Sequence, residues 1–282
     1  MSQIIDGKAI SEKLRGELKV HAAEFERAHG RKIGLAVVMV GENPASEIYI
    51  TNKTVACETV GINSFTHNLG KDSTAAQIVA LIEKLNTAPE VDGILVQLPL
   101  PEHLEEREIL KHIDPAKDVD GFHAVNAGAL LLGMDCLAAC TPAGCVQLIK
   151  STGVDLAGKH AVVVGRSNIV GKPVAILLLH ENCTVTITHS RTKGLAELTR
   201  MADILVVAVG QKHFITGDMI RPGAIVVDVG INREDGKVYG DVDFAAAEKV
   251  AGFITPVPGG VGPMTITMLL ANTVKAAKSR GN

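Results

Sequence analysis

The stretch from Ala161 to Leu179 constrains what this chain can fold into more than any other. It opens with the β-branched run Ala161–Val164, which predicts a buried parallel strand, and it breaks sharply at Gly165. Apolar residues then recur at helical spacing, at Ile169, Pro173, Ile176 and Leu177. A strand, a glycine turn and a helix in this order place backbone N–H groups where they can bind a phosphate. Because Ser167 stands where the G-x-G-x-x-G fingerprint has its second glycine, the turn alone leaves open both a dinucleotide site and an ordinary βα turn.

The segment after the next strand indicates which dinucleotide would bind. Cys183–Thr188 is β-branched and alternating, as a strand requires. In an NAD-binding unit an Asp or Glu follows, roughly 20 residues past the glycines, and binds the ribose hydroxyls. Here residues 189–193 read His-Ser-Arg-Thr-Lys, which offers hydroxyls and cations but no carboxylate. Together with Arg166 in the preceding turn, this segment favours the 2′-phosphate of NADP, and the alternative is a solvated basic loop.

Composition bounds the remaining possibilities. At 282 residues, with 46% hydrophobic and 21% charged residues, the chain can bury the core of one large domain or of two ordinary ones. The net charge of −3 and the absence of a basic run argue against a nucleic-acid partner. No apolar run approaches the ~20 residues that span a bilayer, so we expect no membrane partner.

The five cysteines are not spaced as metal ligands. None forms C-x-x-C, and no histidine stands at zinc-like spacing from them, so we expect no metal site. An odd number of cysteines in apolar contexts indicates reduced structural thiols. With no signal peptide visible at residues 1–10, these thiols favour a cytoplasmic location.

Hydrophobic patterns predict alternating strands and helices along the chain. In the first half we expect helices at Lys8–His29, Ala45–Val60, Thr74–Leu85 (with Ser73 as N-cap) and Leu104–Ile113, and strands at Ile33–Val40, Ile62–Asn68 and Val91–Leu98. In the second half we expect strands at His160–Val164, Cys183–Thr188, Ile204–Val209, Ala224–Val229 and Gly252–Ile254, with a last helix over Met264–Lys278. The order predicts an α/β protein of two domains, each with a mostly parallel sheet, the second a Rossmann-type doubly wound unit.

A lysine on an apolar helix face is the first candidate for chemistry. Tyr49 and Lys53 are four residues apart and share one helix face with Ala56, Cys57 and Val60. Burial lowers the pKa of a lysine, which is what a general base at neutral pH requires. The alternative is a lysine that extends along the domain rim and keeps its charge in water.

Two polar residues are predicted to lie at the same edge of the first sheet. Gln97 comes at the carboxyl end of the strand Gly93–Leu98, where open α/β sheets bind their ligands. Its amide would be buried and would need hydrogen-bond partners. Asp120 lies in a loop after the next helix and so at the same edge, although an Asp in a loop is also a common turn or capping residue.

A proline- and glycine-rich segment precedes the last helix. Residues 256–263 contain three prolines and three glycines, which fix an unusual backbone. We expect a cis peptide bond before Pro258 or before Pro99. We interpret this segment as a loop that lines a ligand cleft, and the alternative is a linker.

Taken together, these motifs resemble the bifunctional methylenetetrahydrofolate dehydrogenase/methenyltetrahydrofolate cyclohydrolases. The matching segments run over essentially the full length and are Ser46–Ile62, Val96–Pro101, Lys117–Gly121, Cys140–Gly144, Gly165–Pro173, His189-Ser190, Gly230–Asn232 and Pro256–Thr265. The last of these segments is highly specific, and no departure falls at a position expected to do chemistry.

The resemblance implies two domains with an active cleft between them. The folate and catalytic domain would comprise residues 1–140 plus the returning C-terminal helix 258–282, and the NADP-binding domain residues 141–257. NADP would be bound by Gly165, Arg166, Ser167, Ser190, Arg191 and Ile231. Tetrahydrofolate derivatives would be bound by Tyr49, Lys53, Val96, Gln97, Leu98, Asp120, Pro258, Gly259 and Gly262. Members of this family are usually homodimers, and their reactions belong to one-carbon metabolism and purine biosynthesis.

The resemblance also assigns roles to the catalytic candidates. Lys53 would move the proton in the hydrolysis step, and Gln97 would orient Lys53. Tyr49 would pack on the folate, and Asp120 would accept hydrogen bonds from the pterin amino and ring N–H groups.

Three alternatives remain open from the sequence. One is a dehydrogenase whose hydrolysis step is slow or absent. Another is an NADP dehydrogenase of a different small substrate, similar to shikimate dehydrogenase in having two α/β domains. The third is a nucleotide-binding module without catalysis. Lys53 on an inner helix face argues against this alternative, because a binding module has no need for such a lysine.

Overall fold

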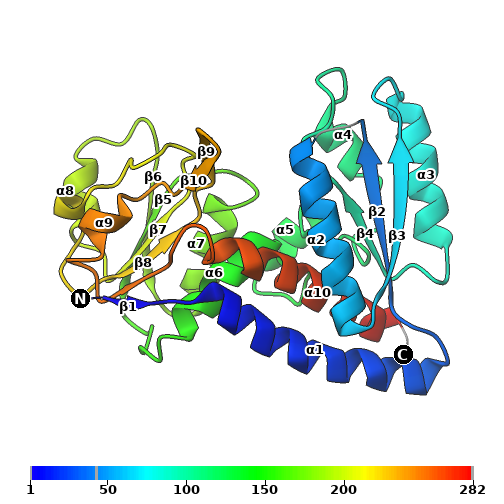
Figure 1. Ribbon diagram of the computed structural model, residues 1–282, viewed down its shortest axis with the longest axis horizontal. Coiled ribbons are helices and arrows are strands. Elements are labelled where there is room, and N and C mark those ends of the chain that lie inside the picture. The colour runs from blue at the N-terminus through cyan, green and yellow to red at the C-terminus, as the bar shows by residue number, and fades with distance from the viewer. Residues whose placement is uncertain (1, 42–43, 281–282) are drawn as a thin grey trace. The chain divides into compact units, whose positions relative to one another are not determined.

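The computed structural model describes residues 2–41 and 44–280, and for 44–51 it describes the backbone alone. Within these ranges the chain forms two compact units (Figure 1). One unit, here the three-stranded unit, comprises residues 13–140 and 266–282. The other, the six-stranded unit, comprises residues 1–12 and 141–265. Two helices are divided between the units, α1 (Gly7–His29) and α10 (Val261–Arg280).

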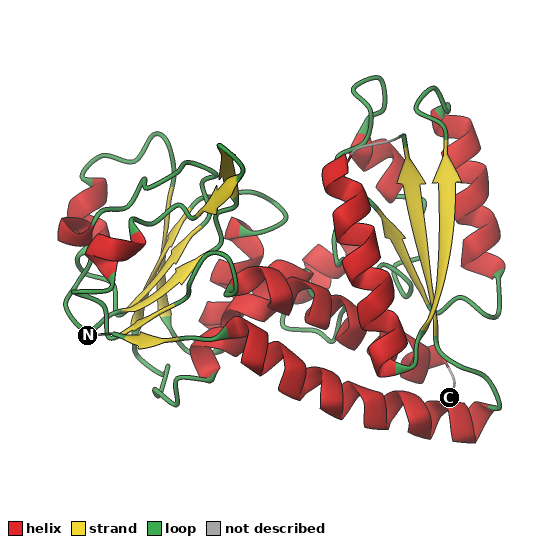
Figure 2. Ribbon diagram, viewed as in Figure 1, coloured by secondary structure: helices red, strands yellow, loops and turns green. Residues whose placement is uncertain are grey.

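The three-stranded unit is built on a parallel sheet with the strand order β3-β2-β4 (Figure 2). Its strands are β2 (Gly34–Val40), β3 (Asn63–Leu69) and β4 (Gly93–Val96). The central strand β2 is apolar throughout and buried along its length but for one half-buried residue, as a strand covered on both faces must be. The outer strand β3 alternates between exposed and half-buried residues. The helices of this unit are α2 (Pro44–Val60), α3 (Ala75–Thr87), α4 (Glu106–Leu110) and α5 (Ala124–Leu131).

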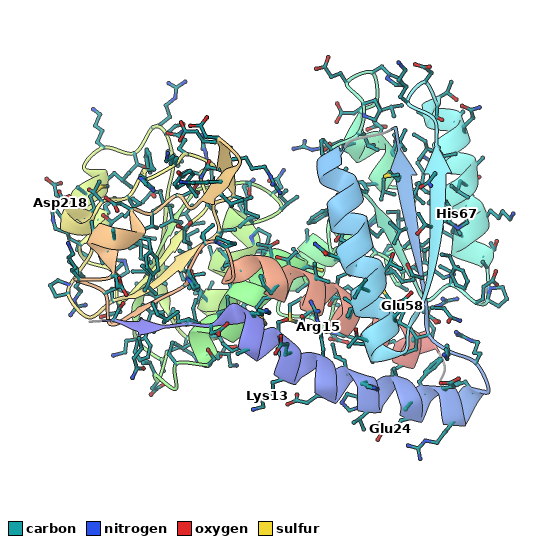
Figure 3. The ribbon with its side chains drawn as sticks, in the orientation of Figure 1. Lys13, Arg15, Glu24, Glu58, His67 and Asp218 are labelled. Carbon is teal, nitrogen blue, oxygen red and sulfur yellow. The ribbon has the colours of Figure 1, made fainter. Side chains whose placement is uncertain are left out.

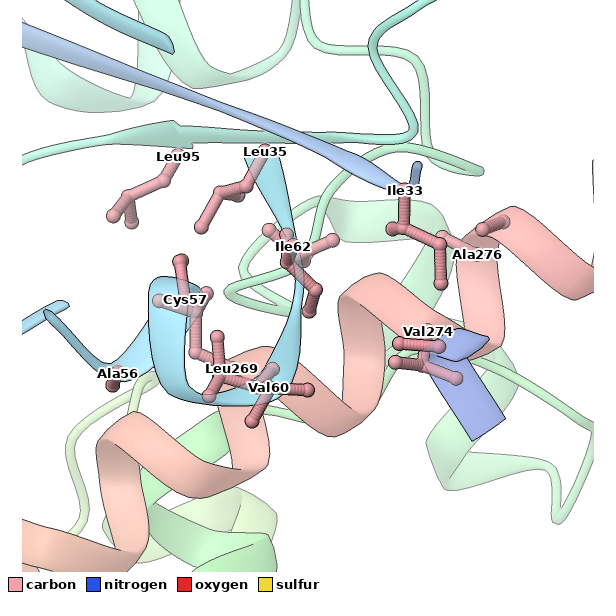
Figure 4. Close-up of a cluster of buried hydrophobic side chains, with 14 of the residues drawn as sticks. Ile33, Leu35, Ala56, Cys57, Val60, Ile62, Leu95, Leu269, Val274 and Ala276 are labelled. Carbon is pink, nitrogen blue, oxygen red and sulfur yellow. The ribbon is translucent and has the colours of Figure 1, made fainter. Parts of the chain in front are cut away.

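Two apolar clusters hold the helices against the two faces of this sheet. On one face, residues of α2 such as Cys57 and Val60 pack with Leu35 of β2 and Leu269 of α10 (Figure 4). The other face buries Ile78 and Ile82 of α3, among others. The continuous apolar strands therefore bring the C-terminal helix onto the same sheet face as α2.

The polar residues of α1 divide between a side exposed to solvent and a side that contacts α10. Lys13 and Glu24 are exposed (Figure 3). In contrast, Nε of Arg15 donates to Oγ1 of Thr267 on α10 at 2.9 Å.

The N-cap of α3 lies one residue after the predicted position. Thr74 rather than Ser73 caps the helix, because its hydroxyl accepts a hydrogen bond from the backbone N–H of Gln77. The side-chain oxygen of Gln77 accepts in turn from the backbone N–H of Thr74, which completes a capping box.

The six-stranded unit has the parallel strand order β1-β11-β8-β7-β5-β6, which confirms the predicted doubly wound sheet. Its strands are β1 (Gln3–Ile4), β5 (His160–Val164), β6 (Thr184–Thr188), β7 (Ile204–Val207), β8 (Ile225–Asp228) and β11 (Phe253–Ile254). Its helical segments are α6 (Cys140–Lys150), α7 (Gly171–His180), α8 (Leu195–Thr199), the 3₁₀ turn η1 (Gly217–Met219) and α9 (Phe244–Ala247). A short antiparallel hairpin, β9 (Asn232–Glu234) with β10 (Lys237–Tyr239), stands apart from the sheet and was not predicted.

The units differ from the expected domain bounds at both ends of the chain. Residues 1–12 belong to the six-stranded unit because β1 pairs in parallel with β11 and so becomes the edge strand of that sheet. Residues 258–265 also belong to it, because the proline- and glycine-rich segment follows β11 directly. Only the part of α10 from residue 266 onward packs with the three-stranded unit.

Candidate functional site

Lys53 of α2 and Gln97 after β4 meet at the carboxyl end of the three-stranded sheet. The side chain of Lys53 is buried, with the residue 8% exposed, and its Nζ donates to Oε1 of Gln97 at 2.8 Å. Nε2 of Gln97 donates in turn to the carbonyl of Leu98 at 2.7 Å, which fixes the amide with its oxygen toward the lysine. The backbone N–H of Gln97 donates to the carbonyl of Val38, so the sheet itself sets the position of this residue.

The surroundings of Lys53 shift its ionisation toward the neutral form. Burial lowers the pKa of Lys53, and the negative charge of Asp120 only partly opposes this shift. Burial also raises the pKa of Asp120 to about 7, and Lys53 opposes that shift. Because each group acts on the other, the two side chains lie within electrostatic reach across the site. An amine and a carboxyl group that both titrate closer to neutrality can exchange protons with a bound substrate.

The thiols near this site are not candidates for nucleophiles. Burial raises the pKa of Cys57 to about 12 and that of Cys140 well above its usual value. Both therefore stay protonated at neutral pH. No cluster of three or more potential metal ligands occurs among the described residues.

Hydrogen bonds on either side of Asp120 hold its loop. The carboxylate of Asp118 accepts from the backbone of His123 at 2.8 Å and from Nδ2 of Asn126 at 2.9 Å. Lys117, which is fully buried, donates through Nζ to the carbonyls of Leu85 and Ala88 at the end of α3, at 2.9 and 3.0 Å. The backbone from 117 to 119 also extends the sheet, since Ile94 bridges to Asp118.

The C-terminal helix adds a residue that sequence reasoning missed. Asn272 of α10 is buried, and its Nδ2 donates to the carbonyls of Val119 and Ala138 at 2.8 Å each. It thus joins the residue before Asp120 to a segment that contacts Gly121, whose φ is +71°. The one available signal was an asparagine directly after the apolar run Met268–Ala271, where a buried amide needs hydrogen-bond partners.

The other predicted folate residues divide between the two units. Val96 is buried at the end of β4 and Leu98 is half-buried beside Gln97. Tyr49 lies on α2, but its side chain is outside the described residues. Pro258, Gly259 and Gly262 belong to the six-stranded unit, with Pro258 exposed and both glycines half-buried. The expected cis peptide bonds are present before both Pro99 and Pro258.

The turn between β5 and α7 has the geometry of a phosphate-binding turn. Gly165 has φ +121°, and a Cβ there would lie 2.2 Å from the carbonyl oxygen of Ala208, so only glycine fits. A Cβ on Gly171, the first residue of α7, would lie 2.3 Å from the carbonyl oxygen of Gly165. Oγ of Ser167 accepts from the backbone of Val170 and Gly171, at 3.1 and 3.3 Å. The turn is thus folded tightly over the helix N-terminus, while Arg166 and Ser167 remain exposed.

Cations stand beside this turn at the end of β6. Gly165 donates to the carbonyl of Thr188, so the segments after β5 and β6 start side by side. Ser190 and Arg191 are exposed there, and residues 189–193 contain no carboxylate. Two arginines and a serine beside a glycine-bounded helix N-terminus fit an adenine dinucleotide with a 2′-phosphate. Ile231, after β8 in the same sheet, is 47% exposed.

Family models match both halves of the chain. Residues 5–120 match the family model described as the catalytic domain of tetrahydrofolate dehydrogenase/cyclohydrolase, and residues 139–281 match its NAD(P)-binding domain. The bifunctional protein FolD of Delftia acidovorans is 55% identical over 98% of both chains.

Solved structures of similar proteins cover the whole chain. A bifunctional FolD methylenetetrahydrofolate dehydrogenase/cyclohydrolase from Campylobacter jejuni is 49% identical, with a TM-score of 0.97 over 99% of this chain and 100% of that one. The FolD of Trypanosoma brucei, solved with NADP and an inhibitor, is 37% identical, with a TM-score of 0.95 over 100% of this chain and 99% of that one. No helix among the described residues is long and apolar enough to cross a membrane.

Proposed function

The chain belongs to the tetrahydrofolate dehydrogenase/cyclohydrolase family, and from this premise we propose that it catalyses two consecutive steps of one-carbon metabolism. In the first, 5,10-methylenetetrahydrofolate is oxidised with NADP⁺ to 5,10-methenyltetrahydrofolate. In the second, water converts the methenyl compound to 10-formyltetrahydrofolate. The observation that carries the second step is the buried contact of Lys53 Nζ with Gln97 Oε1 at 2.8 Å.

Hydrolysis needs a group that takes a proton from water. As water adds to the amidinium carbon of the methenyl compound, one water proton passes to the neutral amine of Lys53. The remaining O–H proton moves to N5 as the bond between N5 and that carbon breaks, which leaves the formyl group on N10. Lys53 then releases its proton to solvent. Gln97 supports this role because its oxygen accepts one N–H of Lys53 and so fixes where the lone pair of the amine points.

The hydride step asks less of side-chain chemistry than the hydrolysis. NADP⁺, when bound, supplies the hydride acceptor. Gly165 lets the backbone of the turn come close to the pyrophosphate, and the N-terminus of α7 favours its negative charge. Arg166, Ser190 and Arg191 would bind the 2′-phosphate, and Ile231 would contact the cofactor from the loop after β8.

Folate binding is proposed for the residues that the family resemblance assigns. The carboxylate of Asp120 would accept two hydrogen bonds from the pterin, and Tyr49 would pack on it. Val96, Leu98, Pro258, Gly259 and Gly262 would complete the contacts. The fixed loop around Asp120 supports this role, because both neighbouring segments are tied to buried partners.

We further propose that the protein is a cytoplasmic homodimer. The five cysteines are free, which suits a reducing compartment. The strand β6 lies at one edge of its sheet and exposes Ile187 to 40%, so its outer side has pairing capacity for a second copy. Sedimentation or light scattering of the purified protein tests this proposal.

An absorbance time course with methylenetetrahydrofolate and NADP⁺ tests the proposed function. NADPH formation without matching accumulation of the methenyl compound, together with consumption of added methenyltetrahydrofolate above the buffer rate, is the expected result. Stoichiometric methenyl build-up would leave a dehydrogenase alone. The absence of NADPH formation, with NAD⁺ also inert, would contradict the proposal.

A further inference from the structure

Asp241 is a buried carboxylate that joins two loops at the carboxyl end of the six-stranded sheet. It is 0% exposed, and its Oδ2 accepts from the backbone of Val209 at 2.7 Å and of Gly210 at 2.9 Å. Its Oδ1 accepts from the backbone of Gln211 and from Nδ2 of Asn232, at 2.9 and 2.8 Å. Val209–Gln211 follows β7, and Asn232 follows β8. One side chain therefore fixes the loops after two neighbouring strands.

The loop after β7 has the shape of an anion-binding site, and the carboxylate of Asp241 occupies this site. Three successive N–H groups, those of Val209, Gly210 and Gln211, converge on the single carboxylate of Asp241, and Gly210 has φ +66°. Such a concave run of N–H groups binds phosphate in many nucleotide proteins. Because an internal carboxylate occupies it here, this loop does not take a cofactor phosphate. That leaves the turn after β5 for the pyrophosphate.

A second buried carboxylate locks Asp241 in place. Asp228, the last residue of β8, accepts from the backbone of Gly230, Asp241 and Val242, each at 2.9 Å. The packing leaves no room for side chains between the two: a Cβ on Gly230 would lie 2.3 Å from Oδ1 of Asp241, and one on Gly240 would lie 1.8 Å from Oδ2 of Asp228. The backbone on either side of Ile231 is therefore set by these two carboxylates.

The position of Asp241 and Asp228 in the sheet indicates which part of the cofactor lies near them. In a doubly wound sheet the dinucleotide crosses the carboxyl ends of the strands. The pyrophosphate turn follows β5, and the arginines that favour the 2′-phosphate of the adenosine half follow β6, on one side of β5. The loops after β7 and β8 lie on the other side of β5, so they face the nicotinamide half.

We propose that Asp241 is a positioning residue for the nicotinamide half of NADP. By holding the loop after β7 against the loop that carries Ile231, it keeps a rigid support for the cofactor ring during hydride transfer. The proposal rests on the dehydrogenase function proposed above. Hydrolysis consumes no oxidant and depends on Lys53 in the other unit, so Asp241 should matter for the first reaction and not for the second.

The substitution Asp241→Asn tests this proposal with little change in size. One carboxylate oxygen becomes an NH₂ group that must face N–H donors, so either the pair Val209 and Gly210 or the pair Gln211 and Asn232 loses its acceptor. We expect the KM and Kd for NADP⁺ to rise about tenfold or more, with consumption of methenyltetrahydrofolate within about twofold of the wild type. Asp235→Asn, at the exposed turn between β9 and β10, is the matched control and should leave both reactions unchanged.

Each outcome of this experiment decides one question. An unchanged KM and Kd for NADP⁺ in Asp241→Asn, with an active wild type, would overturn the positioning role. A loss of both reactions together with a lowered melting temperature would also overturn it, because the residue would then be a general stabiliser. If Asp241→Asn does not fold, Asn232→Ala decides by the same criteria, since it removes one of the four donors and leaves three. A wild type that forms no NADPH would instead overturn the proposed dehydrogenase function, whatever the variants do.

Discussion

Two lysines of the three-stranded unit are buried, and their surroundings differ in a way that separates chemistry from architecture. Burial lowers the pKa of both, that of Lys117 to about 8. Lys117 has its amine between two backbone carbonyls at the end of α3, with the residue 0% exposed. Lys53 has its amine against the single amide oxygen of Gln97 and is 8% exposed.

The comparison shows that a shifted pKa does not by itself mark a catalytic lysine. The amine of Lys117 donates to two backbone carbonyls at the end of α3, so this side chain serves as a helix cap. Lys53 stands instead where parallel strands end and ligands bind, beside one acceptor and within the field of Asp120. The predictions below start from the change that should affect hydrolysis most.

The largest expected effect is that of Lys53→Gln. Loss of the proton acceptor should slow hydrolysis of methenyltetrahydrofolate by about 10²–10⁴-fold, the usual contribution of a general base. NADPH formation should fall far less, since hydride transfer requires no protein base. Lys84→Gln, on the exposed side of α3, is the matched control. Equal loss of both activities with intact NADP binding would make Lys53 a residue that positions substrate.

Gln97→Glu should have the next largest effect. A carboxylate beside Lys53 stabilises the ammonium form and raises its pKa, typically by 1–3 units. The rising limb of the hydrolysis pH profile should move to higher pH, with a fall of about tenfold or more at neutral pH. Gln77→Glu keeps the capping box of α3 and serves as the control. A drop of equal size at every pH would show that Gln97 acts through shape alone.

A smaller effect is expected from pH acting on Asp120. Its pKa is raised to about 7, so the carboxyl group is protonated and uncharged below that pH and accepts hydrogen bonds poorly. The Kd for a folate ligand should therefore rise as pH falls through about 7, approaching tenfold per pH unit. Asp120→Asn should bind weakly and without this pH dependence. Fluorescence titration across pH measures both, and a flat wild-type profile would contradict the assigned role.

Lys117→Gln should have the smallest effect on hydrolysis. It leaves the carbonyls of Leu85 and Ala88 with a poorer donor, so the free energy of unfolding should fall by about 1–3 kcal/mol. The rate of hydrolysis per folded molecule should stay within about twofold of the wild type. Denaturant unfolding and a rate assay at low temperature check the two halves of this prediction. A selective loss of hydrolysis without destabilisation would erase the distinction between the two lysines.

The parts of the fold that follow local patterns could be predicted from the sequence. The apolar runs of β2 and β5 predicted their strands to within a residue, and the break of the apolar run at Gly165 predicted the turn after β5. The edge strand β1 could not be predicted, because two residues carry no period and its partner β11 lies at the other end of the chain. That one pairing also assigns residues 1–12 to the six-stranded unit.

The candidate site shows the same limit. The face shared by Lys53 with apolar neighbours and the place of Gln97 at a strand end are local features, and the structure brings the two side chains into contact. Their catalytic roles stay predictions. Asn272 and Asp241 were not predicted, because each is defined by partners distant in sequence, 153 residues away in the case of Asn272 and Val119. Tertiary packing determines such contacts, and the only sign of them in the sequence is a polar residue at a position that becomes buried.

The ionisation of Lys53 is the most direct test of this account. In protein labelled with ¹³C at the lysine ε-carbons, a pH titration by NMR follows each amine, and Lys53→Arg identifies the resonance of interest. We predict that this resonance titrates below 10.5, the ordinary lysine value. A midpoint at or above 10.5 would mean that Lys53 stays charged at neutral pH and cannot take a proton from water.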